Sequence, residues 1–364
     1  MGRGLFILKK MIQKHHLNGI LFFGLENIRY LCGFTGSDGV LWVSAEEKVF
    51  LSDFRYEEQA RQEVQNAERR TYRQKIEGVA QFLRGRSVKR LGFESSAISF
   101  ENYQRLREKL PRVGFIPLNR EIQRLRACKA SEELEKIRRA VQIASRSFQD
   151  IEGRFRSGVP ERDLADLLEW RMKRRGGEGP AFPTIVASGD RAALPHGRAS
   201  EKRMQNGETV IVDFGARFQG YHSDETVTLI LGRPSIEQRR IYDTVRRAQE
   251  RALHAIRPGA KVQEIDGAAR GVIERAGYGR FFGHGTGHGV GLAIHEEPTL
   301  SPRGQGRIEE GMVFTVEPGI YLPGRGGVRL EELVVVTASG FERLTGLSKE
   351  LSDNIRFPPG GPEF

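Results

Sequence analysis

The sequence predicts an α/β protein of two domains, and three observations support the prediction. The chain has 364 residues, which is more than a single hydrophobic core usually fills. Its first third alternates short apolar runs with helical stretches, as an α/β domain does. From residue 185 onward the sequence becomes rich in strand-like segments. We place the domain boundary near residue 122, which gives domains over residues 1–122 and 123–364.

Each predicted strand is a short apolar run bordered by turn residues. In the first domain we expect strands at residues 17–23, 40–44, 48–52 and 91–94. In the second domain we expect them at residues 209–214, 226–231, 312–316 and 333–336. Apolar residues at helical spacing predict helices at residues 56–67, 100–110, 134–148, 160–174, 236–256 and 262–276.

The composition excludes several classes of protein. No apolar run approaches the roughly 18 residues that a membrane span needs, so we expect no membrane segment. The two cysteines, Cys32 and Cys128, lie far apart, which excludes a disulfide scaffold and a thiolate zinc finger and favours a cytoplasmic location. The net charge of +11 is dispersed among acidic residues and accompanies no nucleic-acid-binding motif. We therefore expect a solvated surface rather than a nucleic-acid partner.

Two aspartates interrupt strongly apolar strands. If these strands form a hairpin that folds at Phe218 and Gln219, Asp213 and Asp224 stand opposite each other, with their Cβ atoms about 5 Å apart. Two carboxylates at that distance repel unless one is protonated or a cation lies between them. The alternative interpretation is a pair of solvated turn aspartates. Acidic side chains on a buried sheet face favour the functional interpretation.

Three of the eight histidines, His284, His288 and His295, fall within twelve positions. Glycine occupies alternate positions over residues 283–291, which lets the backbone approach closely whatever the imidazoles contact. A phosphate-binding loop is the competing interpretation, but neither a GxGxxG register nor a Gly-Lys-Ser/Thr element is present. We expect a metal or catalytic site at this segment.

Glu317 and Glu331 form a third cluster, because each lies at the end of an apolar strand. With the two aspartates they supply four carboxylates, whose combined charge two divalent cations would cancel. An oxygen-rich set with one imidazole suits Mn, Fe or Co better than a thiolate-type zinc site. Two metals that share bridging carboxylates bind a water between them as hydroxide and polarise a carbonyl. The pattern therefore predicts hydrolysis of an amide or a phosphate ester.

These clusters, in this order, resemble the pita-bread metallopeptidase family, which includes prolidase (Xaa-Pro dipeptidase), aminopeptidase P, methionine aminopeptidase and creatinase. The resemblance implies a creatinase-like N-terminal α/β domain followed by a pita-bread α+β catalytic domain with a curved antiparallel sheet. In the catalytic domain the matching segments are residues 195–197, 213–224, 284–298, 317–319 and 327–331. In the N-terminal domain they are residues 27–31, 33–37 and 53–56, in a domain that methionine aminopeptidases lack.

The resemblance implies five metal ligands. By position, Asp213 would bind one ion, and Asp224 and Glu331 would bridge both. His288 and Glu317 would bind the other ion. The ions implied are two divalent metals, with Mn preferred and Co, Fe or Zn as alternatives. All five ligand positions are occupied, which argues against a creatinase-type member that has lost its metals.

The resemblance also implies catalytic roles. Glu317 would accept the proton of the attacking water, and His295 would stabilise the tetrahedral intermediate. His196 and His284 would contact the substrate or shuttle protons, while Arg329 would hold the carboxylates in place.

Three positions depart from the family pattern. Val227 stands where family members usually have the arginine of a Thr-Arg-Thr triplet, and His222 and Glu225 flank Asp224 where other residues are more common. These departures concern substrate preference and metal affinity rather than the hydrolytic chemistry.

The leading hypothesis is a dinuclear-metal hydrolase that cleaves the Xaa-Pro peptide bond, with dipeptides as substrates. A dedicated enzyme is needed for this bond because proline lacks the backbone N–H on which ordinary peptidases depend. Aminopeptidase P activity on longer peptides with proline in second position is the first alternative. A non-catalytic pita-bread protein that binds partners is the second. The family resemblance further implies a homodimer.

Overall fold

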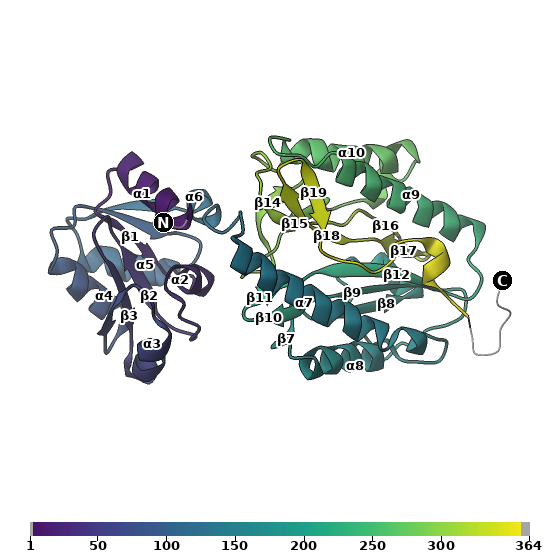
Figure 1. The fold of residues 1–364 in the computed structure, drawn as a ribbon, viewed down its shortest axis with the longest axis horizontal. Coiled ribbons are helices and arrows are strands. Elements are labelled where there is room, and N and C mark those ends of the chain that lie inside the picture. The colour runs from purple at the N-terminus through teal and green to yellow at the C-terminus, as the bar shows by residue number, and fades with distance from the viewer. Residues whose placement is uncertain (1–2, 358–364) are drawn as a thin grey trace. The chain divides into compact units, whose positions relative to one another are not determined.

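The computed structural model describes residues 3–357, which form two compact units (Figure 1). The division falls between Arg126 and Ala127. The domain boundary near residue 122 stays a prediction. None of the helices within residues 3–357 has the length and apolar character needed to cross a membrane.

The first unit is built on a six-stranded mixed sheet with the order β4-β3-β2-β1-β5-β6. Neighbouring strands are antiparallel between β1 and β2 and between β2 and β3, and the other pairs are parallel. The strands are β1 (Gly19–Phe22), β2 (Val40–Val43), β3 (Lys48–Ser52), β4 (Glu68–Thr71), β5 (Arg90–Glu94) and β6 (Gly114–Leu118).

Both faces of this sheet are covered, because residues alternate between two hydrophobic clusters along each strand. Ile20 and Phe22 of β1 belong to one cluster, and Leu21 between them belongs to the other. The helices that supply these clusters are α1 (Arg3–Lys14), α2 (Leu25–Cys32), α3 (Glu57–Glu63), α4 (Lys75–Arg84), α5 (Phe100–Lys109) and α6 (Arg120–Gln123).

The predicted helix over residues 56–67 is wrong beyond Glu63. At Val64 the backbone is extended, with φ −70° and ψ 116°, and the chain continues into β4 beside β3. Val64 is β-branched and favours the extended conformation. Helices α1, α2, α4 and α6 were not predicted, and their apolar residues share the two clusters with the sheet.

The second unit places helices on two sides of a layer of strands (Figure 1). Its helices are α7 (Ser131–Gln149), α8 (Glu161–Arg174), α9 (Ile236–His254) and α10 (Val262–Arg275). The strands before α9 are β7 (Gly179–Pro180), β8 (Ile185–Ser188), β9 (Thr209–Phe214), β10 (Ala216–Phe218), β11 (Tyr221–His222) and β12 (Glu225–Leu231). Those after α10 are β13 (Gly287–Gly289), β14 (Glu296–Leu300), β15 (Val313–Val316), β16 (Gly319–Leu322), β17 (Gly326–Arg329), β18 (Glu332–Thr337), β19 (Gly340–Arg343) and β20 (Ile355–Arg356).

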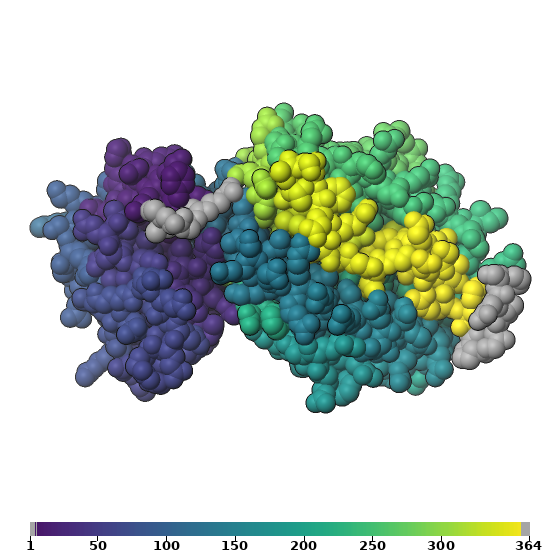
Figure 2. Space-filling view, viewed as in Figure 1, coloured from purple at the N-terminus to yellow at the C-terminus, as the bar shows by residue number. Residues whose placement is uncertain are grey.

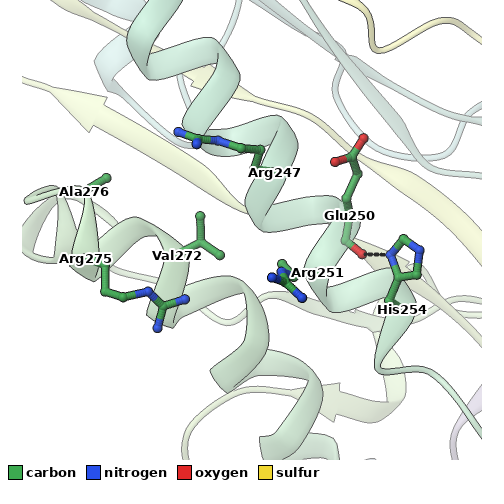
Figure 3. A pocket seen from close by; sticks show the side chains of 7 residues that line it. All are labelled: Arg247, Glu250, Arg251, His254, Val272, Arg275 and Ala276. Atoms are coloured by element: carbon green, nitrogen blue, oxygen red, sulfur yellow. Dashed lines mark hydrogen bonds between the residues drawn. The ribbon is translucent and has the colours of Figure 1, made fainter.

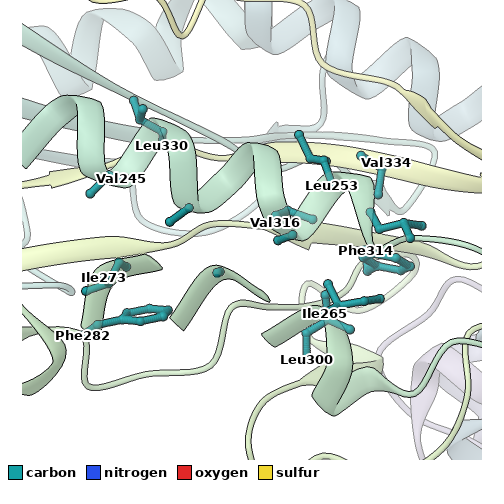
Figure 4. Packing of buried hydrophobic residues seen from close by; sticks show 14 of the residues in the cluster. Val245, Leu253, Ile265, Ile273, Phe282, Leu300, Phe314, Val316, Leu330 and Val334 are labelled. Carbon is teal, nitrogen blue, oxygen red and sulfur yellow. The ribbon is translucent and has the colours of Figure 1, made fainter. Parts of the chain in front are cut away.

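Two sheets carry most of these strands, with the orders β20-β12-β9-β8 and β14-β13-β15-β18-β19. Helices α7 and α8 bury their apolar faces on the first sheet. Helices α9 and α10 cover the second sheet, where Val245, Leu253 and Ile265 belong to one cluster with Phe314 and Val316 of β15 (Figure 4). Each pair of helices thus packs against one sheet and fixes the position of its strands.

The C-terminal part of the chain packs back onto the start of the second unit. Figure 2 shows this segment, in yellow, beside the teal α7 region. An ion pair of 2.7 Å joins Glu342 of β19 to Arg138 of α7, and Ile355 of β20 pairs with Ile230 of β12. The C-terminal segment therefore contacts both the first helix and the first sheet of the second unit.

The hairpin that carries Asp213 and Asp224 folds one residue later than predicted. Its turn lies at Gln219 and Gly220, which have φ of 46° and 78°. A two-residue turn with positive φ at both positions matches the twist of antiparallel strands. Asp213 consequently pairs with Thr226, and the predicted pairing of Asp213 with Asp224 is wrong. Asp224 instead lies in the short break between β11 and β12.

Candidate metal centre

All nine site residues predicted from the sequence line one cavity of about 440 Å³ in the second unit. They come from strand ends and loops that are far apart in the sequence and that the two sheets bring together. These residues are His196, Asp213, Asp224, His284, His288, His295, Glu317, Arg329 and Glu331.

Three of these side chains form a potential metal-binding cluster. Asp224, His288 and Glu331 each offer a ligand atom, and the three atoms lie within 4.8 Å of one another. The Nε2 atom of His288 is 3.5 Å from Oδ2 of Asp224 and 3.5 Å from Oε1 of Glu317. Glu331 is oriented by Thr226, whose hydroxyl donates a hydrogen bond of 2.7 Å to Oε2. The two carboxylates and the imidazole could hold one divalent ion, and Glu317 lies at the edge of the cluster.

Asp213 has one oxygen that is bonded and one that is not. Its Oδ2 accepts a hydrogen bond of 2.6 Å from the buried guanidinium of Arg329. Its Oδ1 is buried and has no hydrogen-bond partner among residues 3–357. Arg329 also donates to the Tyr321 hydroxyl, the Thr226 hydroxyl and the Pro195 carbonyl, so its position is fixed. A buried carboxylate oxygen without a donor is unfavourable, and a bound cation would satisfy it.

The electrostatics of the cavity also fit a cation site. Burial raises the pKa of Asp224 well above its usual value, and the neighbouring Glu331, Asp213 and Glu317 raise it further. Burial raises the pKa of Glu331 in the same way, and it raises the pKa of Glu317 to about 8. Without a metal the site therefore retains protons that a divalent ion would displace. The donor set, four carboxylates and an imidazole, suits divalent metals.

Three histidines of the cavity, His284, His288 and His295, are neutral near pH 7. Burial lowers the pKa of His288 to about 4 and that of His284 to about 4, and it also lowers the pKa of His295. A neutral imidazole is the form that binds a metal. The ring centroids of His288 and His295 are 4.2 Å apart. His196 is exposed, on the loop before β9.

His284 is held by groups that the sequence did not single out. Its Nε2 lies 2.9 Å from the Tyr321 hydroxyl, and its carbonyl accepts a hydrogen bond of 2.7 Å from Arg270. Arg270 in turn pairs with the buried Asp266 of α10. A tyrosine in an apolar strand is common in protein cores. An i,i+4 ion pair in a helix is common on protein surfaces. Only the tertiary structure shows that they support the site.

The glycines around His288 have different roles. A Cβ atom added at Gly287 would lie 1.9 Å from the carbonyl oxygen of Thr315, so β13 can approach β15 only with glycine there. A Cβ atom added at Gly283 meets nothing within 4 Å. The close approach also places the His288 amide 3.1 Å from the Thr315 hydroxyl.

We expect Gly287→Ala to lower the free energy of unfolding by about 2 kcal/mol, because the backbone must move to accept the methyl group. Gly283→Ala, which makes the same chemical change in the same segment, is expected to change it by less than about 0.5 kcal/mol. Urea unfolding of both variants measures the difference. Equal stabilities for the two variants would contradict the packing argument.

The three residues that depart from the family pattern are all buried. Val227 belongs to the hydrophobic cluster beneath α7 and α8. Glu225 pairs with Lys349 at 2.7 Å, and burial lowers the pKa of His222, whose Nδ1 lies 3.0 Å from the Gly291 carbonyl. None of the three lines the cavity among the described residues.

A larger cavity, of about 650 Å³, lies between α9 and α10 (Figure 3). Arg247, Arg251 and His254 line it from α9, and Arg275 lines it from α10. Glu250 is the one carboxylate among its described lining residues, so this cavity does not supply the set that a metal pair needs. The chemistry therefore points to the smaller cavity.

Comparison with known proteins identifies the class. Residues 135–338 match metallopeptidase family M24, and residues 7–128 match the creatinase/prolidase N-terminal domain. The chain belongs to metallopeptidase family M24, and its fold is that of a two-domain pita-bread metallopeptidase. The architecture predicted from the sequence is confirmed.

Individual relatives match over almost their whole length. The Xaa-Pro dipeptidase of Pyrococcus horikoshii is 36% identical over 350 residues, which cover 94% of this chain and 98% of that protein. The structure of an Xaa-Pro dipeptidase from Bacillus anthracis matches with a TM-score of 0.92 and 38% identity, over 98% of this chain and 99% of that chain. The structure of an X-Pro aminopeptidase from Thermotoga maritima matches with a TM-score of 0.85 and 36% identity, over 96% of this chain and 100% of that chain.

Proposed function

We propose that this protein is a metal-dependent Xaa-Pro dipeptidase. The observation that carries the proposal is the cluster of Asp224, His288 and Glu331, with Asp213 and Glu317 in the same cavity, in a chain that is 36% identical to an Xaa-Pro dipeptidase. The substrate would be a dipeptide whose second residue is proline. A cavity of about 440 Å³ lies in the size range of sites for small molecules.

Two divalent ions, with manganese preferred, would be held by the five predicted ligands: Asp213, Asp224, His288, Glu317 and Glu331. The donor-free Oδ1 of Asp213 and the raised carboxyl pKa values support this assignment. When bound, such ions lower the pKa of water and polarise the scissile carbonyl. Cobalt, iron and zinc are the alternative metals.

The remaining predicted residues would position the reactants and move protons. Glu317 would accept a proton from the attacking water and return it to the proline nitrogen. His295 would donate a hydrogen bond to the oxygen of the tetrahedral intermediate, which its neutral imidazole can do through one ring N–H. His284, fixed by Tyr321, and His196 would contact the substrate. Arg329 would hold Asp213 in place without touching the peptide.

Aminopeptidase P activity on longer peptides is the second candidate, supported by the structural match to the X-Pro aminopeptidase of Thermotoga maritima. A non-catalytic role would remove the need for the five ligands, which line the cavity together here. A cytoplasmic location and a homodimer are further parts of the proposal, supported by the cysteine content and by the family resemblance.

The test is a cleavage assay on metal-stripped protein before and after Mn²⁺ is restored. The substrates are an Xaa-Pro dipeptide, an Xaa-Pro-Xaa tripeptide and an Xaa-Ala control. We expect metal-dependent cleavage of the dipeptide. Preference for the tripeptide would assign aminopeptidase P activity. Failure to cleave any of the three, with metal bound, would overturn the assignment of an Xaa-Pro peptidase.

A further inference from the structure

Asp266 and Arg270, here called the α10 pair, form an ion pair on the buried side of α10. Asp266 is 1% exposed, and each of its carboxylate oxygens accepts a hydrogen bond of 2.9 Å from Arg270. An i,i+4 ion pair within a helix contributes little to stability, whereas the burial of a charged group is costly. Helix stability therefore does not account for this pair, and its contacts outside α10 indicate a second role.

The two side chains make four further hydrogen bonds, all to the loop before β13. Nη1 of Arg270 donates to the Phe282 carbonyl at 3.0 Å, and Nη2 donates to the His284 carbonyl at 2.7 Å. Oδ1 of Asp266 accepts hydrogen bonds from the amide and the hydroxyl of Thr286, at 3.1 Å and 2.9 Å. Three alternate residues of the loop are thus fixed to α10 through their main chain.

The attached loop determines which ring nitrogen of His284 carries the proton. Nδ1 lies 2.8 Å from the Gly285 carbonyl oxygen, which can only accept a hydrogen bond, so Nδ1 bears the hydrogen. Nε2 then accepts a hydrogen bond of 2.9 Å from the Tyr321 hydroxyl, which itself accepts one from Arg329. Gly285 lies between His284 and Thr286, whose main chains are both bonded to the α10 pair. The orientation of its carbonyl, and with it the tautomer of His284, therefore depends on that pair.

The same loop also fixes the main chain of Glu317, the proposed proton acceptor. The Thr286 carbonyl accepts a hydrogen bond of 2.7 Å from the Glu317 amide, one residue beyond the end of β15. Thr286 is itself completely buried and is bonded to Asp266 through its amide and hydroxyl. A displacement of about 1 Å caused by a distant mutation can lower a rate by about 100-fold. The α10 pair is thus connected to two groups of the site, His284 and Glu317.

We propose that Asp266 and Arg270 are positioning residues for the hydrolytic reaction. They hold the loop that carries His284 and the end of β15 that leads to Glu317, without touching the substrate or a metal. Neither of them is among the described residues that line the cavity. This inference rests on the proposed Xaa-Pro activity, and it adds that the rate of the chemical step depends on the α10 pair more than substrate binding does.

The experiment compares variants of the full-length, Mn²⁺-loaded protein in the cleavage of an Xaa-Pro dipeptide. Asp266→Asn keeps the size of the side chain but removes the charge that orients Arg270. We expect it to lower kcat by about 10- to 100-fold and to change KM by less than about 3-fold, because misplaced groups stabilise the transition state less. Arg270→Met should lower kcat to the same extent. Arg270→Lys, which keeps the charge and can donate to one carbonyl, should lose less.

Arg246 and Glu250 of α9 supply a matched control. They form the same i,i+4 ion pair, at 2.8 Å, outside the cavity of the ligand cluster. Glu250→Gln should leave kcat and KM unchanged.

Imidazole nitrogen chemical shifts give a readout without turnover. They are measured on Zn²⁺-loaded protein, because zinc is diamagnetic, and the spectrum of His284→Gln assigns the signals of His284. The wild type should show His284 protonated at Nδ1. Asp266→Asn should show a mixture of the two tautomers, because the Gly285 carbonyl is no longer held in place.

The outcomes are distinguishable. Wild-type protein that cleaves no Xaa-Pro peptide would overturn the proposed function, and the positioning of a hydrolytic reaction with it. An active wild type, with unchanged kcat in Asp266→Asn and Arg270→Met, would overturn the positioning role alone. A lower Tm in these variants, without a change in kcat or in the imidazole shifts, would show that the pair only stabilises the fold and would have the same consequence. If neither variant folds, Arg270→Lys decides, because its kcat and its imidazole shifts must both change for the role to hold.

Discussion

Replacing His288 by alanine is expected to lower kcat/KM for Xaa-Pro cleavage by about 1000-fold or more. His288 is the one imidazole in the cluster, and its Nε2 atom lies 3.5 Å from both Asp224 and Glu317. Without it, the ion on that side would be held by carboxylates alone. The loss of a metal that acts as a Lewis acid removes several kcal/mol of transition-state stabilisation. The measurement is kcat/KM with Mn²⁺ present, together with metal content per chain by mass spectrometry.

The exposed His254 offers a matched control. It lines the other cavity, on α9, and its ring contacts the Glu250 carbonyl. His254→Ala should retain wild-type activity and metal content. If His288→Ala keeps both its metal and its activity, the assignment of His288 as a ligand is wrong. If it loses activity but keeps all its metal, His288 acts on the substrate instead.

The sequence identified residues that share one cavity more completely than it predicted the strands that carry them. Polar residues that interrupt apolar strands carry a local signal, and all nine predicted residues do line one cavity. The register of the hairpin between Asp213 and Asp224 depends on which two residues adopt positive φ. Gln219 is not a residue type that indicates this, so the turn was placed one residue too early.

The support around the site could not be predicted, because it depends on contacts between distant segments. Tyr321 lies 37 positions from His284 in the sequence, and Thr226 lies 105 positions from Glu331. A tyrosine and a threonine in apolar strands have common structural roles. Nothing in their local patterns distinguishes them from residues of the core.

Metal removal is expected to make the stability of the protein depend on pH in a direction opposite to that given by carboxylates paired with a cationic side chain, whose pKa values are lowered on folding. In the metal-free protein burial raises the pKa of Glu317 from its usual value of 4.5 to about 8, and it raises the pKa values of Asp224 and Glu331 as well. Between pH 5 and pH 8 the folded state keeps protons that the unfolded state has lost. The free energy of unfolding therefore falls as pH rises through this interval, and levels off above it.

The contribution of Glu317 alone is on the order of 4 kcal/mol, since each pKa unit corresponds to about 1.4 kcal/mol. In a unit of this size, a loss of that free energy lowers the Tm of the metal-free protein by about 10 °C between pH 5 and pH 8.

A variant and a metal addition test this expectation. Glu317→Gln replaces the titrating group by a neutral one of the same shape and should show a smaller decrease in Tm. Addition of Mn²⁺ at pH 8 should restore the Tm of the wild type, because the ion replaces the protons and stabilises the ionised carboxylates. Calorimetry of the two proteins at both pH values, with and without Mn²⁺, measures each difference. Identical pH profiles for wild type and Glu317→Gln would show that the carboxylate is already ionised without metal. In that case the repulsion within the cluster must be relieved by another group, for which Arg329 is placed closest to Asp213.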